Sequence, residues 1–117
     1  MNLQRGDVVL CRVPMPSTGL LKFKLRPAII ISSDRLNQIL DDVMVVPYTS
    51  NTKRHLTATQ HLLAGEEIAQ AGIKVELVIR CESIFTLNQS MILRTLGFLS
   101  TDQLNSVNLC LISALGL

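Results

Sequence analysis

The sequence predicts a mostly β (α+β) fold in which short antiparallel strands are followed by one C-terminal helix. Apolar runs of strand length recur along the chain, prolines and glycines separate them, and a long helical pattern occurs after Ser100. The composition agrees, because 48% of the residues are hydrophobic and only 17% are charged, which excludes a disordered chain. A length of 117 residues is typical of one domain, so we expect residues 1–117 to form a single domain.

The first quarter of the chain predicts two strands separated by a long loop. Valine and leucine dominate residues 7–13, which are expected to form a strand. Residues 14–24 contain two prolines, Ser, Thr and Gly and predict a surface loop, a kind of segment that often carries function in small domains. Residues 27–32 (PAIIIS) predict a short apolar strand, and Asp34 is placed to cap a helical turn that reaches Gln38.

The middle of the chain predicts a third strand and a less regular region. Residues 43–48 are apolar, and Pro47 indicates that this strand ends at an edge or a bulge of the sheet. Residues 51–54 predict a polar turn, residues 56–63 alternate weakly as a strand can, and residues 65–72 predict a turn-rich connection.

Residues 74–86 predict the most informative strand, because its alternation assigns side chains to two faces. The first face carries Leu77, Ile79, Cys81 and Phe85. The other face carries Val78, Arg80, Glu82 and Ile84.

The C-terminal third predicts one more strand, around residues 96–99, and then a helix. Ser100 and Gln103 have the spacing of a helix-capping box, and Gly116 is suited to end the helix. The apolar stripe of this helix is expected to comprise Leu104, Val107, Leu111, Ile112 and Leu115. Together these elements fit a small SH3-like barrel with a C-terminal helix.

Several classes of site are not expected. Cys11, Cys81 and Cys110 are odd in number and lack zinc-ligand spacing, which predicts buried, reduced thiols in a cytoplasmic protein. His55 and His61 have no partners at ligand spacing, so we expect no metal and no cofactor. The N-terminal residues are too polar for a signal peptide, and no apolar run is long enough to cross a membrane.

The net charge of +2 is small, but the charges are unevenly distributed. Residues 1–26 contain five basic residues and one acidic residue, whereas the segment after Ser83 contains only Arg94 and Asp102. The basic segment could meet a polyanion. The nearly uncharged segment is expected to supply core and a subunit interface.

Four stretches in series resemble those of the MazF/PemK-type toxins, the ribosome-independent endoribonucleases of type II toxin–antitoxin systems. They are residues 5–9 (RGDVV), 24–32 (KLRPAIIIS), 45–51 (VVPYTSN) and 78–83 (VIRCES). The resemblance covers nearly the whole chain. It implies a barrel of the CcdB/Kid/MazF type, a homodimer, metal-free cleavage of single-stranded RNA, and a cognate antitoxin that blocks the RNA groove.

Metal-free RNA cleavage uses the 2′-hydroxyl as nucleophile and yields a 2′,3′-cyclic phosphate, so the site needs a base, an acid and positive charge. Arg26 opens the second expected strand and Thr49 closes the third, which brings both to one rim of an antiparallel pair. By resemblance they match the catalytic Arg and Thr of the family. Arg26 would stabilise phosphate charge and take part in proton transfer. Thr49 would bond the scissile phosphate, with Ser50 assisting.

Arg80 and Glu82 are the other two candidate catalytic residues. They are two residues apart on one expected strand and would share a face, so Glu82 is a candidate general base beside a cation. By resemblance they match the Arg and Asp of an Arg-Cys-Asp-Gln stretch in PemK-like members. This chain has a longer acid, and Ser83 replaces the Gln amide.

RNA binding is expected at Lys22, Phe23 and Lys24 in the first loop, where Phe23 could stack on a base, and at Ser50 and Asn51. The loop residues could equally serve loop packing or a partner-peptide site.

Two alternatives to an endoribonuclease toxin remain open at this point. A CcdB-like toxin of the same fold would bind DNA gyrase through C-terminal residues that include a Trp. This chain has no Trp and ends in residues 114–117 (ALGL), which argues against that function. A degenerate member that only binds RNA or antitoxin would fit the changes at Glu82 and Ser83.

Overall fold

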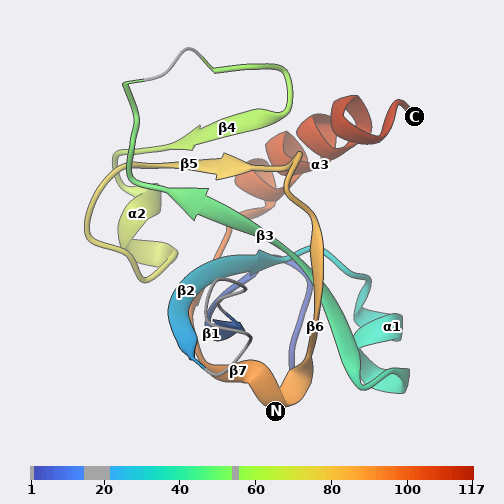
Figure 1. Ribbon diagram of the computed structural model, residues 1–117. Helices are drawn as coiled ribbons and strands as arrows, with labels where there is room; N and C mark the ends of the chain where they lie inside the picture. The colour runs from blue at the N-terminus through green and yellow to red at the C-terminus, as the bar shows by residue number, and fades with distance from the viewer. Residues whose placement is uncertain (1, 15–21, 54–55) are drawn as a thin grey trace.

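The computed structural model describes residues 2–14, 22–53 and 56–117, and it contains one bent antiparallel sheet with a long helix packed on it (Figure 1). The strands are β1 (Asp7–Pro14), β2 (Phe23–Ile30), β3 (Asp42–Thr49), β4 (Gln60–Leu63), β5 (Leu77–Arg80), β6 (Phe85–Asn88) and β7 (Ile92–Phe98). The helices are α1 (Asp34–Ile39), α2 (Glu67–Gln70), the 3-10 turn η2 (Gln89–Met91) and α3 (Thr101–Leu115).

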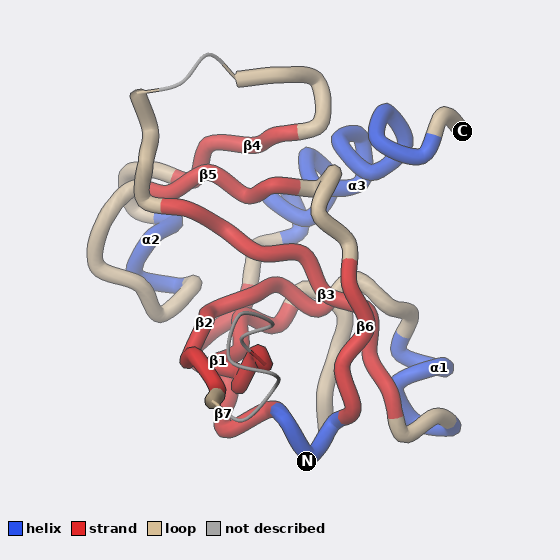
Figure 2. The backbone as a smooth tube through the Cα atoms, in the orientation of Figure 1, coloured by secondary structure: helices blue, strands red, loops and turns tan. Residues whose placement is uncertain are grey.

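The strands pair in the order β4-β5-β3-β2-β1-β7, and β6 pairs with β3 beside this path. The predicted antiparallel fold with a C-terminal helix is therefore confirmed. Among the described residues β4, β6 and β7 each pair with one strand only, so the sheet curls like a small barrel without closing (Figure 2).

β3 is the central strand, and its partner changes part-way along. One side of β3 pairs with β2. The other side pairs first with β6, up to Val45, and then with β5 from Tyr48 onward. Pro47 lies in the gap between these two ladders, where its missing N–H removes no bond from the ladder on that side. Pro47 was expected to place the end of the strand at an edge or a bulge, but β3 continues to Thr49 and Pro47 instead lies where its partner on this side changes.

The strand predicted over residues 74–86 is divided in two by the same gap. Residues 46 and 47 of β3 stand opposite five residues of the segment that joins β5 to β6, residues 80–84. The excess forms a turn closed by the bond from Ser83 N to Arg80 O, 3.2 Å long. Arg80 is therefore the last residue of β5, and residues 81–84 leave the sheet before β6 begins.

Three other elements differ from the prediction in extent. β4 covers only residues 60–63 of the weakly alternating segment, because only these residues stand opposite β5. A short helix, α2, occupies part of the connection at residues 65–72. β7 begins earlier than expected, at Ile92, because Ile92 already pairs with Cys11 of β1.

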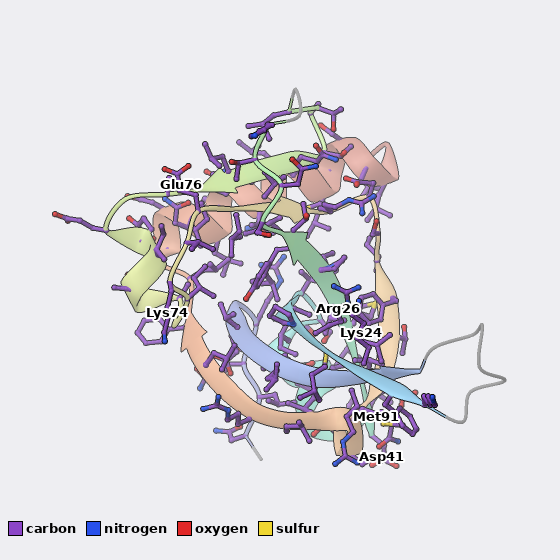
Figure 3. The ribbon with its side chains drawn as sticks, turned by 60° about the vertical axis from the view of Figure 1, so that its left-hand side comes forward. Lys24, Arg26, Asp41, Lys74, Glu76 and Met91 are labelled. Atoms are coloured by element: carbon purple, nitrogen blue, oxygen red, sulfur yellow. The ribbon has the colours of Figure 1, made fainter. Side chains whose placement is uncertain are left out.

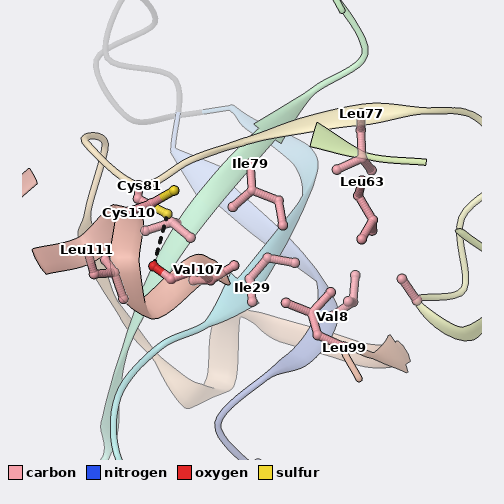
Figure 4. Close-up of a cluster of buried hydrophobic side chains, with 12 residues drawn as sticks. Val8, Ile29, Leu63, Leu77, Ile79, Cys81, Leu99, Val107, Cys110 and Leu111 are labelled. Carbon is pink, nitrogen blue, oxygen red and sulfur yellow. Dashed lines mark hydrogen bonds between the residues drawn. The ribbon is translucent and has the colours of Figure 1, made fainter. Parts of the chain in front are cut away.

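The sheet is apolar on both faces and packs against two separate cores. Neighbouring residues such as Ile29 and Ile30 point to opposite cores because side chains alternate along a strand. The first core lies between the sheet and α3, as Figure 4 shows, and the second lies on the other face of the sheet, among side chains of β1, β2, β3, β6 and β7. This two-sided burial accounts for most of the high apolar content.

α3 begins and ends as predicted. Ser100 Oγ accepts a hydrogen bond from Gln103 N at 3.2 Å, and Gly116 ends the helix with a φ of 71°. The predicted apolar stripe is only partly correct, since Ile112 and Leu115 are 44% and 57% exposed and Cys110 is buried instead. No helix among the described residues is long and apolar enough to cross a membrane.

The cap of α1 also differs from the prediction. Ser33, not Asp34, is the N-cap, and its hydroxyl accepts from Leu36 N at 3.2 Å. The Asp34 carboxylate instead accepts from Arg5 N at 2.6 Å and so ties the N-terminal segment to this helix.

The three cysteine thiols are buried, as predicted, and are expected to be unreactive in the native protein. Burial raises the pKa of Cys11 to about 11 and that of Cys81 to about 12, so about one Cys11 thiol in a thousand is ionised near pH 8. Iodoacetamide should label the native chain far more slowly than the chain unfolded in guanidinium chloride, as measured by mass spectrometry. Labelling of Cys81 at the rate of free cysteine would contradict this expectation.

Candidate active site

A pocket of about 550 Å³ opens where β2, β3, β5 and β6 meet. Three of the four predicted catalytic residues, Arg26, Thr49 and Arg80, contribute to its wall, and Glu82 does not. The complete lining comprises Val13, Arg26, Pro27, Pro47, Tyr48, Thr49, Ser50, Arg80 and Phe85.

Arg26 and Thr49 converge because the ladder between β2 and β3 stops just before them. Its last pair is Ala28 with Pro47, and two residues further along each strand, on the same face, stand Arg26 and Thr49. Arg26 is thus inside β2, opposite Cys11 of β1, and does not open the strand as predicted. The prediction that the two side chains meet is nevertheless consistent with the shared pocket.

The Thr49 hydroxyl is held by the chain that follows it. Thr49 Oγ1 accepts a hydrogen bond from Asn51 N at 3.2 Å, which fixes the oxygen and leaves the hydroxyl proton to be donated elsewhere. Ser50 lines the pocket, whereas Asn51 acts on it only through this backbone bond.

Arg80 and Glu82 are paired, but not because they share a strand face. Arg80 ends β5 and Glu82 lies in the turn that follows, where Arg80 Nε donates to Glu82 Oε2 at 3.0 Å. Partial burial raises the pKa of the Glu82 carboxyl, but hydrogen bonds from its own backbone, Thr59, Gln60 and Arg80 outweigh this effect. The net result is a pKa below the usual value for glutamate, so the group is a carboxylate at neutral pH.

The predicted RNA-binding residues of the first loop lie mostly in a strand. β2 begins at Phe23, so Phe23 and Lys24 belong to it, and Lys22 immediately precedes it; residues 15–21 of the predicted loop lie outside the described residues. Lys24 shares a face of β2 with Arg26, and Figure 3 shows the two side by side. Phe23, which is 48% exposed, alternates with them and points to the other face.

Phe85 and Val13 also line the pocket, and neither was predicted as a site residue. Both also pack against the second core, so they form an apolar floor beneath the polar wall. Phe85 could have been found only by recognising that the strand breaks after Arg80, since an unbroken strand puts Phe85 on the face away from Arg80. Tyr48 also lines the pocket, and burial raises its pKa to about 12, which keeps its hydroxyl protonated.

The pocket is built for an anion. Two guanidinium groups line it, Lys24 extends the positive strip, and no carboxylate is among the described lining residues. Planar guanidinium groups with hydroxyl donors beside them match the oxygens of a phosphate. Among the described residues, no group of three or more His, Cys, Asp or Glu side chains forms a candidate metal site.

A family model described as PemK-like, MazF-like toxin of type II toxin-antitoxin system matches residues 4–115. No curated protein matches the sequence significantly.

Similar solved structures include an endoribonuclease in complex with its cognate antitoxin from a mycobacterial species, with a TM-score of 0.77 and 24% identity over 98% of this chain and 96% of that chain. The toxin MazF-mt6 of Mycobacterium tuberculosis has a TM-score of 0.75 and 22% identity over 95% and 97%. A MazE–MazF structure from Deinococcus radiodurans has a TM-score of 0.78 and 22% identity over 100% and 98%. These likenesses establish a shared fold.

Proposed function

Because this chain belongs to the family of PemK-like, MazF-like toxins of type II toxin–antitoxin systems, we propose that it is an endoribonuclease that cleaves single-stranded RNA without a metal. The observation that carries the proposal is the pocket shared by Arg26, Thr49 and Arg80. Such a donor set binds the charged oxygens of a phosphodiester, and its two cations would repel a divalent metal.

The proposed reaction is an internal transfer at phosphorus. The ribose 2′-oxygen bonds to the adjacent phosphorus, the bond to the 5′-oxygen breaks, and the products carry a 2′,3′-cyclic phosphate and a 5′-hydroxyl. Arg26 and Arg80 stabilise the extra negative charge of the phosphorane, and Thr49 donates a hydrogen bond to a non-bridging oxygen. The 2′-hydroxyl proton passes to solvent, and Arg26 donates a hydrogen bond to the departing 5′-oxygen, which takes its proton from water. DNA is not cleaved because it lacks the nucleophile.

A nucleobase of the RNA next to the scissile phosphate is proposed to pack on the apolar floor formed by Phe85 and Val13. Both are partly accessible from the pocket, and an aromatic ring offers a surface on which a base can stack. The stacking role considered for Phe23 is therefore transferred to Phe85, which lies on the same side as the cationic wall.

The Phe85→Leu variant is expected to raise KM for a short RNA about tenfold with a smaller effect on kcat, since stacking contributes about 1–3 kcal/mol per base. Leucine keeps apolar volume against the core, so the fold should survive. Phe23→Leu, the same change on the opposite face of β2, is the matched control and should leave KM within about twofold. The reverse pattern would return the stacking role to Phe23.

A cognate antitoxin and a second copy of the chain are the proposed partners. Two of the similar structures are complexes, one of an endoribonuclease with its cognate antitoxin and one of MazE with MazF. The outer side of α3 supports a protein interface, because Leu109, Ile112 and Leu115 are 67%, 44% and 57% exposed. An acidic antitoxin segment would suit the cationic pocket.

The test is to incubate the purified protein with mixed RNA in EDTA and to identify the ends produced. We expect cleavage with 2′,3′-cyclic phosphate and 5′-hydroxyl ends, and no cleavage of a substrate with one 2′-deoxy sugar at the cut site. Intact RNA in EDTA with cleavage restored by Mg²⁺ would overturn the metal-free mechanism. Intact RNA under both conditions would overturn the enzymatic function, and gyrase-dependent growth arrest would then support the CcdB-like alternative.

A further inference from the structure

Glu82 is held by donors from two separate parts of the chain. Thr59 Oγ1 donates to Glu82 Oε1 at 2.9 Å, and Gln60 Nε2 donates to Glu82 Oε2 at 3.2 Å. Arg80 Nε donates to the same Oε2 at 3.0 Å. Both carboxylate oxygens are therefore occupied, and the carboxylate joins the start of β4 to the end of β5.

The backbone reinforces this connection. Gln60 stands opposite Arg80 in the ladder between β4 and β5, and Cys81 N donates to Thr59 O at 3.0 Å. Thr57 Oγ1 and Thr59 Oγ1 lie 2.9 Å apart, which orders the hydroxyl row that leads to the carboxylate. The two donors are thus fixed relative to the turn that carries Glu82.

A hydrogen bond at the Nε of an arginine fixes the orientation of its guanidinium group. The guanidinium is planar and carries its donors in a rigid fork, so a bond to Nε–H sets the plane and leaves the two Nη groups to project beyond it. Arg80 lines the pocket and Glu82 does not, although its carboxylate touches the arginine. The exposed fraction of the Arg80 side chain is 39%. Without the bond to Glu82 the side chain would therefore be free to change rotamer.

We propose that Thr59, Gln60 and Glu82 form a positioning clamp that fixes the Arg80 guanidinium toward the scissile phosphate, and that Glu82 is not the general base. The inference rests on the proposed RNA cleavage. It makes β4, which contributes nothing to the lining of the pocket, part of the catalytic apparatus. A carboxylate outside the pocket that already accepts three side-chain bonds is poorly placed to take a proton from the 2′-hydroxyl.

The test is a double-mutant cycle with kcat and KM as readouts. Thr59→Val removes one donor at nearly constant shape and should lower kcat about 3- to 10-fold with KM little changed, while Thr59→Ser should restore kcat. In an Arg80→Ala background, Thr59→Val and Glu82→Gln should have no further effect, because the group they position is gone. Thr95→Val, an exposed threonine of β7, is the matched control and should leave kcat unchanged.

Two outcomes would overturn the clamp. If Thr59→Val costs the same with and without Arg80, its role is structural and not directed at that side chain. If Glu82→Gln still costs 100-fold or more in the Arg80→Ala background, the carboxylate acts on substrate as a base.

An NMR measurement separates failure of the clamp from failure of the proposed function. The Arg80 Nε–H proton should exchange slowly with water in the wild type and faster in Thr59→Val, whether or not the protein cleaves RNA. Slow exchange in a protein that leaves RNA intact would support the clamp and overturn the endoribonuclease function. Fast exchange in the wild type would overturn the clamp.

Discussion

Replacing Arg26 by alanine is expected to reduce kcat/KM for RNA cleavage by about 100- to 1,000-fold, the usual cost of losing one preorganised donor to a charged transition state. The side chain is exposed on β2 and lines the pocket, so its loss removes a charge from the site and no core contact. Most of the effect should fall on kcat, because the charge that Arg26 balances is greatest in the phosphorane. Single-turnover cleavage of a defined RNA measures it.

Two further variants control this expectation. Arg26→Lys keeps the charge but loses the planar fork, so it should recover only part of the activity. Arg35→Ala removes another exposed arginine, which lies on α1 and is not among the residues that line the pocket, so it should leave cleavage unchanged. Equal losses in Arg35→Ala and Arg26→Ala would show that net charge, and not the pocket, is responsible.

Replacing Gly97 by alanine is expected to destabilise the fold by about 3 kcal/mol, at the upper end of the cost of overpacking. A Cβ atom at this position would lie 2.4 Å from Gln70 O, 2.5 Å from Ala71 C and 2.7 Å from Gly72 N. All three are backbone atoms, which cannot move aside as a side chain can. Residues 70–72 and β7 would therefore have to move apart, and the packing of the end of α2 against β7 would be lost.

Urea unfolding and thermal melting measure this effect, and Tm should fall by about 10 °C or more. Gly65→Ala is the control, because its added Cβ would meet nothing, although its φ of 68° makes alanine strained by about 1 kcal/mol. A loss at Gly97 no larger than that at Gly65 would contradict the close backbone approach. The φ of Gly97 is not positive, so steric contact alone would account for a larger loss.

The features that the sequence predicted depend on neighbours in the chain. Ser100 and Gly116 mark the ends of α3 by local hydrogen bonding and backbone conformation, and both positions are confirmed. The approach of Arg26 and Thr49 follows from one antiparallel pairing across a short connection, which the order of elements already implies.

The features that the sequence did not predict depend on distant partners. The strand over residues 74–86 looks continuous because its own residues favour a strand, whereas the break lies opposite Pro47 of another strand and shows only in the pairing. The donors to Glu82 come from Thr59 and Gln60, in a segment whose alternation is too weak to indicate what it pairs with. Phe85 was not predicted as a site residue because the break after Arg80 was not predicted.

The gap opposite Pro47 separates the residues that build the sheet from those that can vary. Glu82 and Ser83 lie in the turn and take no part in the ladders of β5 or β6, so changing them shifts no strand pairing. The Glu and Ser of this chain can therefore be replaced, for example by the Asp and Gln that the resemblance to PemK-like members implies, without altering the register of β3. An acid of different reach can thus be placed beside Arg80 while the register of the strands stays the same.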